Sequence, residues 1–163
     1  MFDITRTVDN YISEASLEAT KSPCRTQHGC VAVVNGRIIA RGHNHYRNSS
    51  SDGFVNDICT CHAEMAALRN IYRTINGRGH YNKNTKKNKI FKKVILYVVR
   101  INKENMLMKS KPCTDCMEVI KSLKIKKIIH SCDEGEIDMI LPEDYKETYY
   151  TLSKKFLINQ ILI

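Results

Sequence analysis

Apolar and polar residues follow clear periods in the first third of the chain. Over residues 3–20, apolar side chains recur every three or four positions, which predicts an amphipathic helix. Pro23 follows shortly and should end that helix. The apolar run over residues 30–34 predicts a buried strand, and the Asn35-Gly36 pair after it predicts a tight turn into a second strand over residues 37–42. We therefore expect an antiparallel hairpin after the first helix.

The middle of the chain predicts a loop, a helix and a strand. Residues 43–58 are polar and typical of a loop, whereas residues 61–75 have helical apolar spacing that should end near residues 76–77. Residues 92–101 are rich in Val and Ile, which predicts a central strand buried on both faces. A polar connection over residues 102–111 should follow it.

The last third predicts a helix, two paired strands and a terminal helix. Pro112 suits the start of a helix over residues 113–125, because the first helical turn has no need of the missing N–H. Residues 125–131 predict a strand, and a turn around residues 133–135 should lead into a further strand, residues 136–142, antiparallel to it. Residues 143–163 predict a terminal helix whose packing residues include Tyr149, Leu152, Phe156 and Ile163.

Two short motifs at predicted helix starts carry the chemistry. Cys113 and Cys116 lie three residues apart after Pro112, so both sulfur atoms can project to one side of the first helical turn. Two thiolates and the imidazole of His62 form three ligands of a tetrahedral zinc site, with a fourth position left for water. The positive end of a helix also stabilises thiolates at neutral pH. We therefore expect His62, Cys113 and Cys116 to bind one catalytic zinc ion per chain.

Glu64 supplies a general acid and base beside that expected metal. It follows His62 by two residues, which places it near the zinc without making it a ligand. Two thiolates already offset the charge of zinc, so a water at this metal is acidified less than at a site with three neutral His ligands, and a nearby base becomes more important. His-x-Glu combined with Pro-Cys-x-x-Cys is the known signature of zinc-dependent base deaminases.

On these motifs, residues 3–140 resemble the cytidine and deoxycytidylate deaminase superfamily. The resemblance implies an α/β fold in three layers, α-β-α, with a mixed five-stranded sheet flanked by helices. It also implies zinc ligation by His62, Cys113 and Cys116 and proton transfer by Glu64. By the same resemblance, substrate contacts are expected from Asn44, at the end of the second strand, and from the backbone N–H of Ala63, with stacking by the loop aromatics Tyr46 or Phe54.

The expected reaction is hydrolysis of a cytosine nucleoside or nucleotide, namely cytidine, deoxycytidine or dCMP, to the uracil product and ammonia. Lys111 precedes Pro112, whereas the resemblance implies an acidic residue there in tRNA adenosine deaminases, and this difference favours a small substrate. The resemblance associates an antiparallel pairing of the last two strands with free cytidine deaminases more than with nucleic-acid editors. The antiparallel pairing predicted here therefore also favours a small substrate. Arg25 and Lys111 are candidate phosphate contacts.

Three other interpretations remain open at this point. An editor of RNA or single-stranded DNA would use the Lys-rich loop from Lys83 to Lys93 as its binding surface, although such runs are more often solvated loops. A catalytically silent zinc-binding partner subunit would not need Glu64. A structural zinc site would recruit Cys61 or Cys59 as a fourth ligand.

Composition limits the class of protein. The 163 residues, 42% hydrophobic and 26% charged with a formal charge of +9, fit one folded domain over residues 1–163. The odd number of Cys residues, seven, and the lack of an export signal favour reduced thiols. The lack of an export signal and of a long apolar segment favours a cytoplasmic location without membrane association. Apolar residues in the tail over 153–163 favour a homo-oligomer.

The remaining His and Cys residues suggest weaker hypotheses. Cys24, His28 and Cys30 could bind a second metal, but a buried strand residue and two loop residues are the expected alternative. We expect His43 and His45 to be solvated loop residues. His130 and Cys132 have no partner visible in the sequence, and we expect a packing role for both.

Overall fold

A mixed six-stranded sheet forms the centre of the protein, as a computed structural model of residues 4–55, 60–77, 79–80, 82, 86–146 and 148–161 describes it. Its strand order is β2-β1-β3-β5-β6, with the short β4 paired to the end of β3. β3 and β5 run parallel, and the other pairs are antiparallel. The strands are β1 (Gln27–Val34), β2 (Arg37–His43), β3 (Ile95–Ile101), β4 (Leu107–Met108), β5 (Lys127–Ser131) and β6 (Ile137–Ile140).

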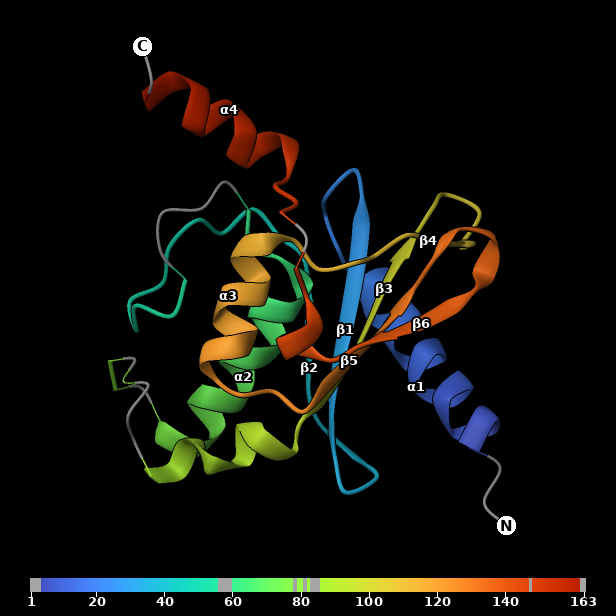
Figure 1. The fold of residues 1–163 in the computed structure, drawn as a ribbon, viewed down its shortest axis with the longest axis horizontal. Coiled ribbons are helices and arrows are strands. Elements are labelled where there is room, and N and C mark those ends of the chain that lie inside the picture. The colour runs from blue at the N-terminus through green and yellow to red at the C-terminus, as the bar shows by residue number, and fades with distance from the viewer. Residues whose placement is uncertain are drawn as a thin grey trace.

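Helices cover both faces of the sheet and form the two outer layers (Figure 1). α1 (Ile4–Ala19) lies on one face, and α2 (Ala63–Asn76) and α3 (Thr114–Ser122) lie on the other. α4 (Leu152–Ile161) extends away from the rest of the protein (Figure 1). The three-layer α-β-α prediction is therefore confirmed. Within the part of the chain that the structure covers, every helix is too short or too polar to cross a membrane.

The alternation of side chains along the strands explains the two cores. Cys30 and Ala32 of β1 pack with α2 and α3, whereas their neighbours Val31 and Val33 pack with α1. Successive strand residues point to opposite faces, so an apolar run such as CVAVV serves both layers at once. The run predicted as a buried strand is buried on both faces for this reason.

Both predicted hairpins are confirmed. Asn35 and Gly36 have φ angles of 49° and 75°, the left-handed conformations that a two-residue turn between β1 and β2 requires. β5 and β6 pair antiparallel around the short 3-10 helix η2 (Asp133–Gly135).

Three predictions need correction. The polar connection after β3 contains β4, because the backbone of Met108 accepts a hydrogen bond from Ser131 Oγ at 2.6 Å and pairs with β3. Part of the predicted basic loop is the 3-10 helix η1 (Lys86–Lys93), in which Phe91 is completely buried and fixes the segment to the core. Pro112 lies before the N-cap of α3 rather than inside the helix.

The terminal helix begins later than predicted. Residues 142–144 form the 3-10 helix η3 (Pro142–Asp144), and the chain then pairs with the start of α3: Thr114 N donates to Tyr149 O at 2.7 Å, and Tyr149 N donates to Thr114 Oγ1 at 2.8 Å. Because these backbone groups are engaged by α3, they cannot form helical hydrogen bonds. Tyr149 is 50% exposed rather than a packing residue. The side chains of Leu152 and Phe156, and residue Ile163, lie outside the described part of the chain.

The loop between β2 and α2 is tied to α2 by an ion pair. The Arg69 guanidinium lies 2.8 Å from Asp52 Oδ2, and Ser50 Oγ and Phe54 N also donate to the Asp52 carboxylate. Burial alone would raise the pKa of Asp52, but these donors, Arg69 foremost, outweigh it and lower that pKa to about 2. The contact fixes the loop that leads to the first chemical motif.

Gly29 allows α1 to approach β1. A Cβ atom at this position would overlap the carbonyl oxygen of Ala15 and the backbone of Ala19. We expect Gly29→Ala to lower the free energy of unfolding by at least about 2 kcal/mol, because the helix must move away from the sheet. Urea denaturation checks this expectation, with Gly79→Ala as the control because its nearest neighbour would be Asn76 O at 3.9 Å. Equal stability of the two variants would contradict the close approach.

The Asp52–Arg69 pair should make stability depend on pH. Asp52→Asn leaves the partly buried Arg69 guanidinium without its counter-charge, and we expect the free energy of unfolding to fall by about 2 kcal/mol at neutral pH. Because the folded pKa is about 2, below the ordinary 3.8, the stabilisation is complete above the ordinary value and disappears as the pH falls toward about 2. Urea denaturation across this range measures the difference, with Asp9→Asn on the exposed side of α1 as control. A difference that persisted in acid would contradict the assignment.

Candidate metal centre and active site

His62, Cys113 and Cys116 meet where two helices begin. His62 is the N-cap residue of α2, Cys113 is the N-cap residue of α3, and Cys116 lies in the first turn of α3. His62 Nδ1 is 3.1 Å from Cys116 Sγ and 3.5 Å from Cys113 Sγ. The two predicted motifs, about 50 residues apart in sequence, are therefore brought together in the structure.

The separations between these atoms fit a tetrahedral zinc ion. With bonds of about 2.3 Å to sulfur and about 2.0 Å to nitrogen, neighbouring S and N ligands lie roughly 3.5 Å apart. Among the residues that the structure covers, Cys61 does not join the group and instead lines a different pocket. Cys59 lies outside the described residues. A structural site with Cys61 as fourth ligand is therefore not supported. The described residues supply three donors, one fewer than a tetrahedral site has.

The segment before Cys113 is held at both ends by hydrogen bonds. The buried Ser110 donates through Oγ to Val98 O of β3 at 2.8 Å, and its N–H donates to Ser131 O of β5 at 2.9 Å. Tyr145 Oη donates to Pro112 O at 2.9 Å. These bonds fix the start of α3 against the sheet and with it the position of both sulfur atoms.

The three side chains share charge in a way suited to a metal. A hydrogen bond from the Cys116 thiol lowers the pKa of Cys113 to about 4, although burial acts in the opposite direction. The same hydrogen bond, together with burial, raises the pKa of Cys116. Burial alone would lower the pKa of His62, but the hydrogen bond with Cys113 and the charges of Glu64 and Cys113 raise it to about 9. A bound cation would take the place of the protons that these three side chains share.

Glu64 lies next to this group in the first turn of α2. Its side chain is 4% exposed, and burial raises the pKa of its carboxyl group. No other side chain donates a hydrogen bond to it within the described part of the chain. A buried carboxyl group with a raised pKa can both accept and release protons near neutral pH.

A cavity of about 420 Å³ opens onto this group. Its volume lies in the range of small-molecule sites, about 300 to 1,000 Å³. Three cations and a single carboxylate, that of Glu64, line the described part of its wall. The lining residues are Thr26, His28, Asn44, Thr60, His62, Glu64, Arg100, Lys109, Ser110, Lys111, Cys113, Tyr149 and Thr151.

The predicted substrate contacts lie at this cavity or beside it. Asn44 lines it and is anchored there: its Nδ2 donates to Thr26 O at 2.7 Å, and its Oδ1 accepts from His28 N at 2.8 Å. An amide carries two N–H donors, so one remains for a ligand. Ala63 is completely buried between His62 and Glu64, and as the first residue of α2 its N–H has no partner within the helix.

The structure does not place the two predicted stacking aromatics at the cavity. Tyr46 is 63% exposed and donates to Pro23 O, and Phe54 packs on Tyr72 with ring centroids 5.9 Å apart. Neither lines the cavity, because both belong to the outer part of the loop. Tyr149 lines the cavity instead. No local signal could have indicated this, since only the pairing of its backbone with α3 brings it there.

Other residues at the cavity were missed or only partly anticipated. His28 lines the wall, and burial, with the nearby charges of His62 and Arg100, lowers its pKa to about 4, so its ring is neutral. Of the two candidate phosphate contacts, Lys111 lines the cavity and Arg25 does not. Arg100 and Lys109 were not predicted, because their role depends on how β3 and the segment after β4 lie together.

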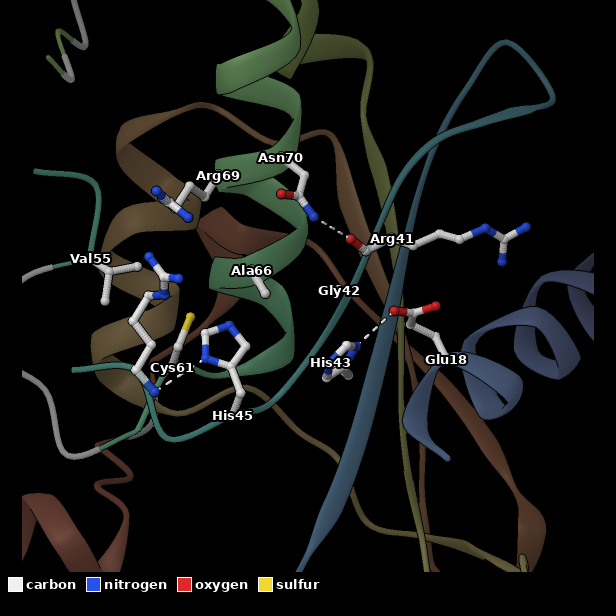
Figure 2. A pocket seen from close by; sticks show the side chains of 11 residues that line it. Glu18, Arg41, Gly42, His43, His45, Val55, Cys61, Ala66, Arg69 and Asn70 are labelled. Atoms are coloured by element: carbon white, nitrogen blue, oxygen red, sulfur yellow. Dashed lines mark hydrogen bonds and ion pairs between the residues drawn. The ribbon is translucent and has the colours of Figure 1, made fainter. Parts of the chain in front are cut away.

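His43 and His45 line a different and smaller pocket, of about 100 Å³, between β2 and α2 (Figure 2). His43 Nδ1 lies 2.8 Å from Glu18 Oε1, and Arg47 N donates to His45 Nδ1 at 3.3 Å. The two rings are thus held by protein partners rather than fully solvated. Cys24, His28 and Cys30 do not form a metal-binding group in the described structure.

Comparison with known proteins identifies the family. Residues 5–132 match the family described as the cytidine and deoxycytidylate deaminase zinc-binding region. The fold is similar to that of a dCMP deaminase from the cyanophage S-TIM5 in apo form, with 22% identity, a TM-score of 0.51 and coverage of 77% of this chain and 82% of that one. It is also similar to a cytidine deaminase from Burkholderia pseudomallei, with 15% identity, a TM-score of 0.57 and coverage of 86% and 98%. No curated protein sequence matches significantly. The chain belongs to the cytidine and deoxycytidylate deaminase family.

Proposed function

We propose that this protein is a zinc-dependent hydrolytic deaminase that converts a cytosine nucleoside or nucleotide to its uracil counterpart and ammonia. One observation carries the proposal: the buried carboxyl group of Glu64 lies beside the His62, Cys113 and Cys116 group at a cavity large enough for one nucleotide. Membership of a deaminase family agrees with this chemistry.

His62, Cys113 and Cys116 would hold the zinc ion. When bound, zinc supplies the Lewis acidity that makes water nucleophilic at neutral pH. Glu64 accepts the proton that water loses as its oxygen attacks C4 of the cytosine ring. Glu64 passes this proton to ring nitrogen N3, then takes the second proton from the new C4 hydroxyl and gives it to the amine. The C4–N bond breaks as the C4 carbonyl forms, so that one water is consumed and one ammonia is released.

The polar wall of the cavity orients the substrate in this proposal. Asn44 donates its remaining N–H to the sugar or the base, and the backbone N–H of Ala63 binds the base oxygen. Tyr149 offers an aromatic surface beside the ring. Arg100, Lys109 and Lys111 give the same cavity three cations. This excess favours a monophosphate such as dCMP over a neutral nucleoside, since cationic side chains bind phosphate through charge-assisted hydrogen bonds.

The alternative of a nucleic-acid editor has less support. η1, which contains most of the described lysines of the basic segment, packs near the C-terminal end of α2 (Figure 1). His62 caps the opposite end of that helix, which is roughly 20 Å long. η1 is therefore distant from the proposed zinc. A silent subunit would not require Glu64 at the cavity. A homo-oligomeric assembly and a cytoplasmic location stay predictions.

Replacing Glu64 tests the proposed reaction. Glu64→Gln keeps the size of the side chain but cannot move protons, so we expect ammonia release to fall by at least about a hundredfold while zinc content is unchanged. The assay covers cytidine, deoxycytidine, their monophosphates, guanine, adenosine and a tRNA anticodon stem. Glu118→Gln, at an exposed position of α3, is the matched control. Release from only the tRNA stem would favour the editor, and equal activity of wild type and Glu64→Gln would overturn the proposal.

Replacing Arg100 tests the preference for a monophosphate. Arg100→Gln removes a cation from the cavity wall, and we expect KM for dCMP to rise about tenfold while KM for deoxycytidine changes little. Steady-state kinetics with both substrates measures the difference. Arg37→Gln, at the exposed start of β2, should leave both values unchanged. An equal rise for both substrates would indicate a general effect on the cavity rather than a phosphate contact.

A further inference from the structure

A second group of metal-binding residues lies on the β5–β6 hairpin. His130 and Asp138 are directly opposite each other in the antiparallel pairing. Cys132 follows His130 by two residues, and residues two apart on an extended chain project to the same face. One ligand atom from each residue lies within 4.8 Å of the others. None of the three lines the cavity that contains Glu64.

The ring of His130 has a fixed tautomer. Its Nδ1 is 3.1 Å from the Ser131 carbonyl oxygen and 4.0 Å from Cys132 Sγ. The carbonyl oxygen can only accept, so the shorter contact requires a hydrogen on Nδ1. In a neutral ring the lone pair then lies on Nε2. Burial lowers the pKa of His130, which favours this neutral form. A His ring that donates one N–H to a backbone carbonyl and keeps the lone pair of its other nitrogen free is the arrangement found in metal-binding His residues.

The Nε2 atom of His130 is buried and unpaired. The side chain is 2% exposed, and Nε2 has no hydrogen-bond partner in the described structure. Leaving a buried polar atom unpaired costs about 1–3 kcal/mol. The nearest carboxylate oxygen, Asp138 Oδ2, is 3.9 Å away, too far for a hydrogen bond, and a carboxylate could not donate one. Two ligands of one tetrahedral ion, with bonds of about 2.0–2.2 Å each, lie roughly 3.4 Å apart, so the exposed Asp138 side chain needs to move about half an ångström closer to bind the same ion.

The surrounding charges favour a cation. His130 is subject to the electrostatic influence of three charged residues, Asp138, Lys111 and Lys109. Negative charge near Cys132 also comes from Asp133 and Glu136. Lys109 N also donates to Asp133 Oδ1 at 3.1 Å, which fixes the turn. Three carboxylates thus oppose two ammonium groups before the thiol of Cys132 loses its proton. A cation at this position would offset the excess negative charge.

We propose that His130, Cys132 and Asp138 bind a second zinc ion that links β5 to β6. Imidazole, thiolate and carboxylate together suit zinc among the common divalent metals, with water as the fourth ligand. Asp138 is 68% exposed on its side chain, so this ion exchanges more readily than one held by His62, Cys113 and Cys116. The proposal rests on the hairpin geometry and does not depend on deaminase activity.

The test counts zinc ions in the full-length protein after dialysis against buffered free zinc. We expect two ions per wild-type chain and one per chain in Cys132→Ala and in Asp138→Asn. Glu134→Gln removes an exposed carboxylate from the same turn and should keep both ions. His130 is left intact, because its burial would make a substitution affect folding.

Cobalt substitution provides a second measurement. Co²⁺ bound to a thiolate gives a charge-transfer absorption, and titration of wild type should show two saturating steps, of which Cys132→Ala loses one. Circular dichroism of zinc-free wild type and Asp138→Asn should be the same, which separates loss of a ligand from loss of the fold. A single ion in wild type, or the same count in wild type, Cys132→Ala and Asp138→Asn, would overturn the second site.

The two proposals fail in different ways. Two bound ions without ammonia release would reject the deaminase function and leave the hairpin site intact. One bound ion with full Glu64-dependent ammonia release would reject the hairpin site alone. Asp138→Asn loaded with one zinc ion should release ammonia at the wild-type rate, because it keeps His62, Cys113 and Cys116.

Discussion

The site depends on the convergence of two helix N-termini on one face of the sheet. α2 and α3 share the core formed with β1, β3 and β5, and each begins with a capping residue that faces the other. His62 and Cys113 therefore meet at a point where two positive helix ends coincide. The unpaired N–H groups and the helix dipoles favour anionic sulfur there. The hydrogen bond from the Cys116 thiol lowers the pKa of Cys113 to about 4. Neither helix could provide the three donors alone.

The cavity combines this centre with a buried acid and a basic wall. Glu64 follows the cap of α2, so the same helix start that positions His62 also places a carboxyl group beside it. Burial raises the pKa of that carboxyl group. Arg100 belongs to β3 and Lys109 to the segment after β4, so the basic wall comes from other elements. In the proposed function, proton transfer and anion recognition therefore depend on different structural elements. A substitution that removes a cation from the wall should leave the position of Glu64 unchanged.

The hairpin group of His130, Cys132 and Asp138 is built on a different principle. Here the register of two antiparallel strands, rather than the start of helices, brings the side chains together. The first group is largely enclosed by the core, while the second has an exposed carboxylate at the edge strand β6. The core therefore fixes His62, Cys113 and Cys116 before any metal binds. At the edge strand, the exposed side chain of Asp138 can still move toward or away from His130 and Cys132.

The sequence by itself determined the local elements and the chemistry of the motifs. Apolar periods predicted the helices and the buried strands, and the Asn35-Gly36 turn predicted the first hairpin. The two motifs indicated the four residues of the chemical centre, His62, Glu64, Cys113 and Cys116. Each of these signals lies within a few consecutive residues, so the sequence alone carries it. The polar connection that forms β4 and the segment that begins α4 late were mistaken, because hydrogen bonds to Ser131 and Thr114, distant in sequence, decided them. For the same reason, only the tertiary structure shows that Tyr149, rather than Tyr46 or Phe54, lines the cavity, and that Arg100 lies there too. It also shows that Asp138 lies opposite His130. Each of these placements depends on contacts between elements, which no local sequence pattern encodes.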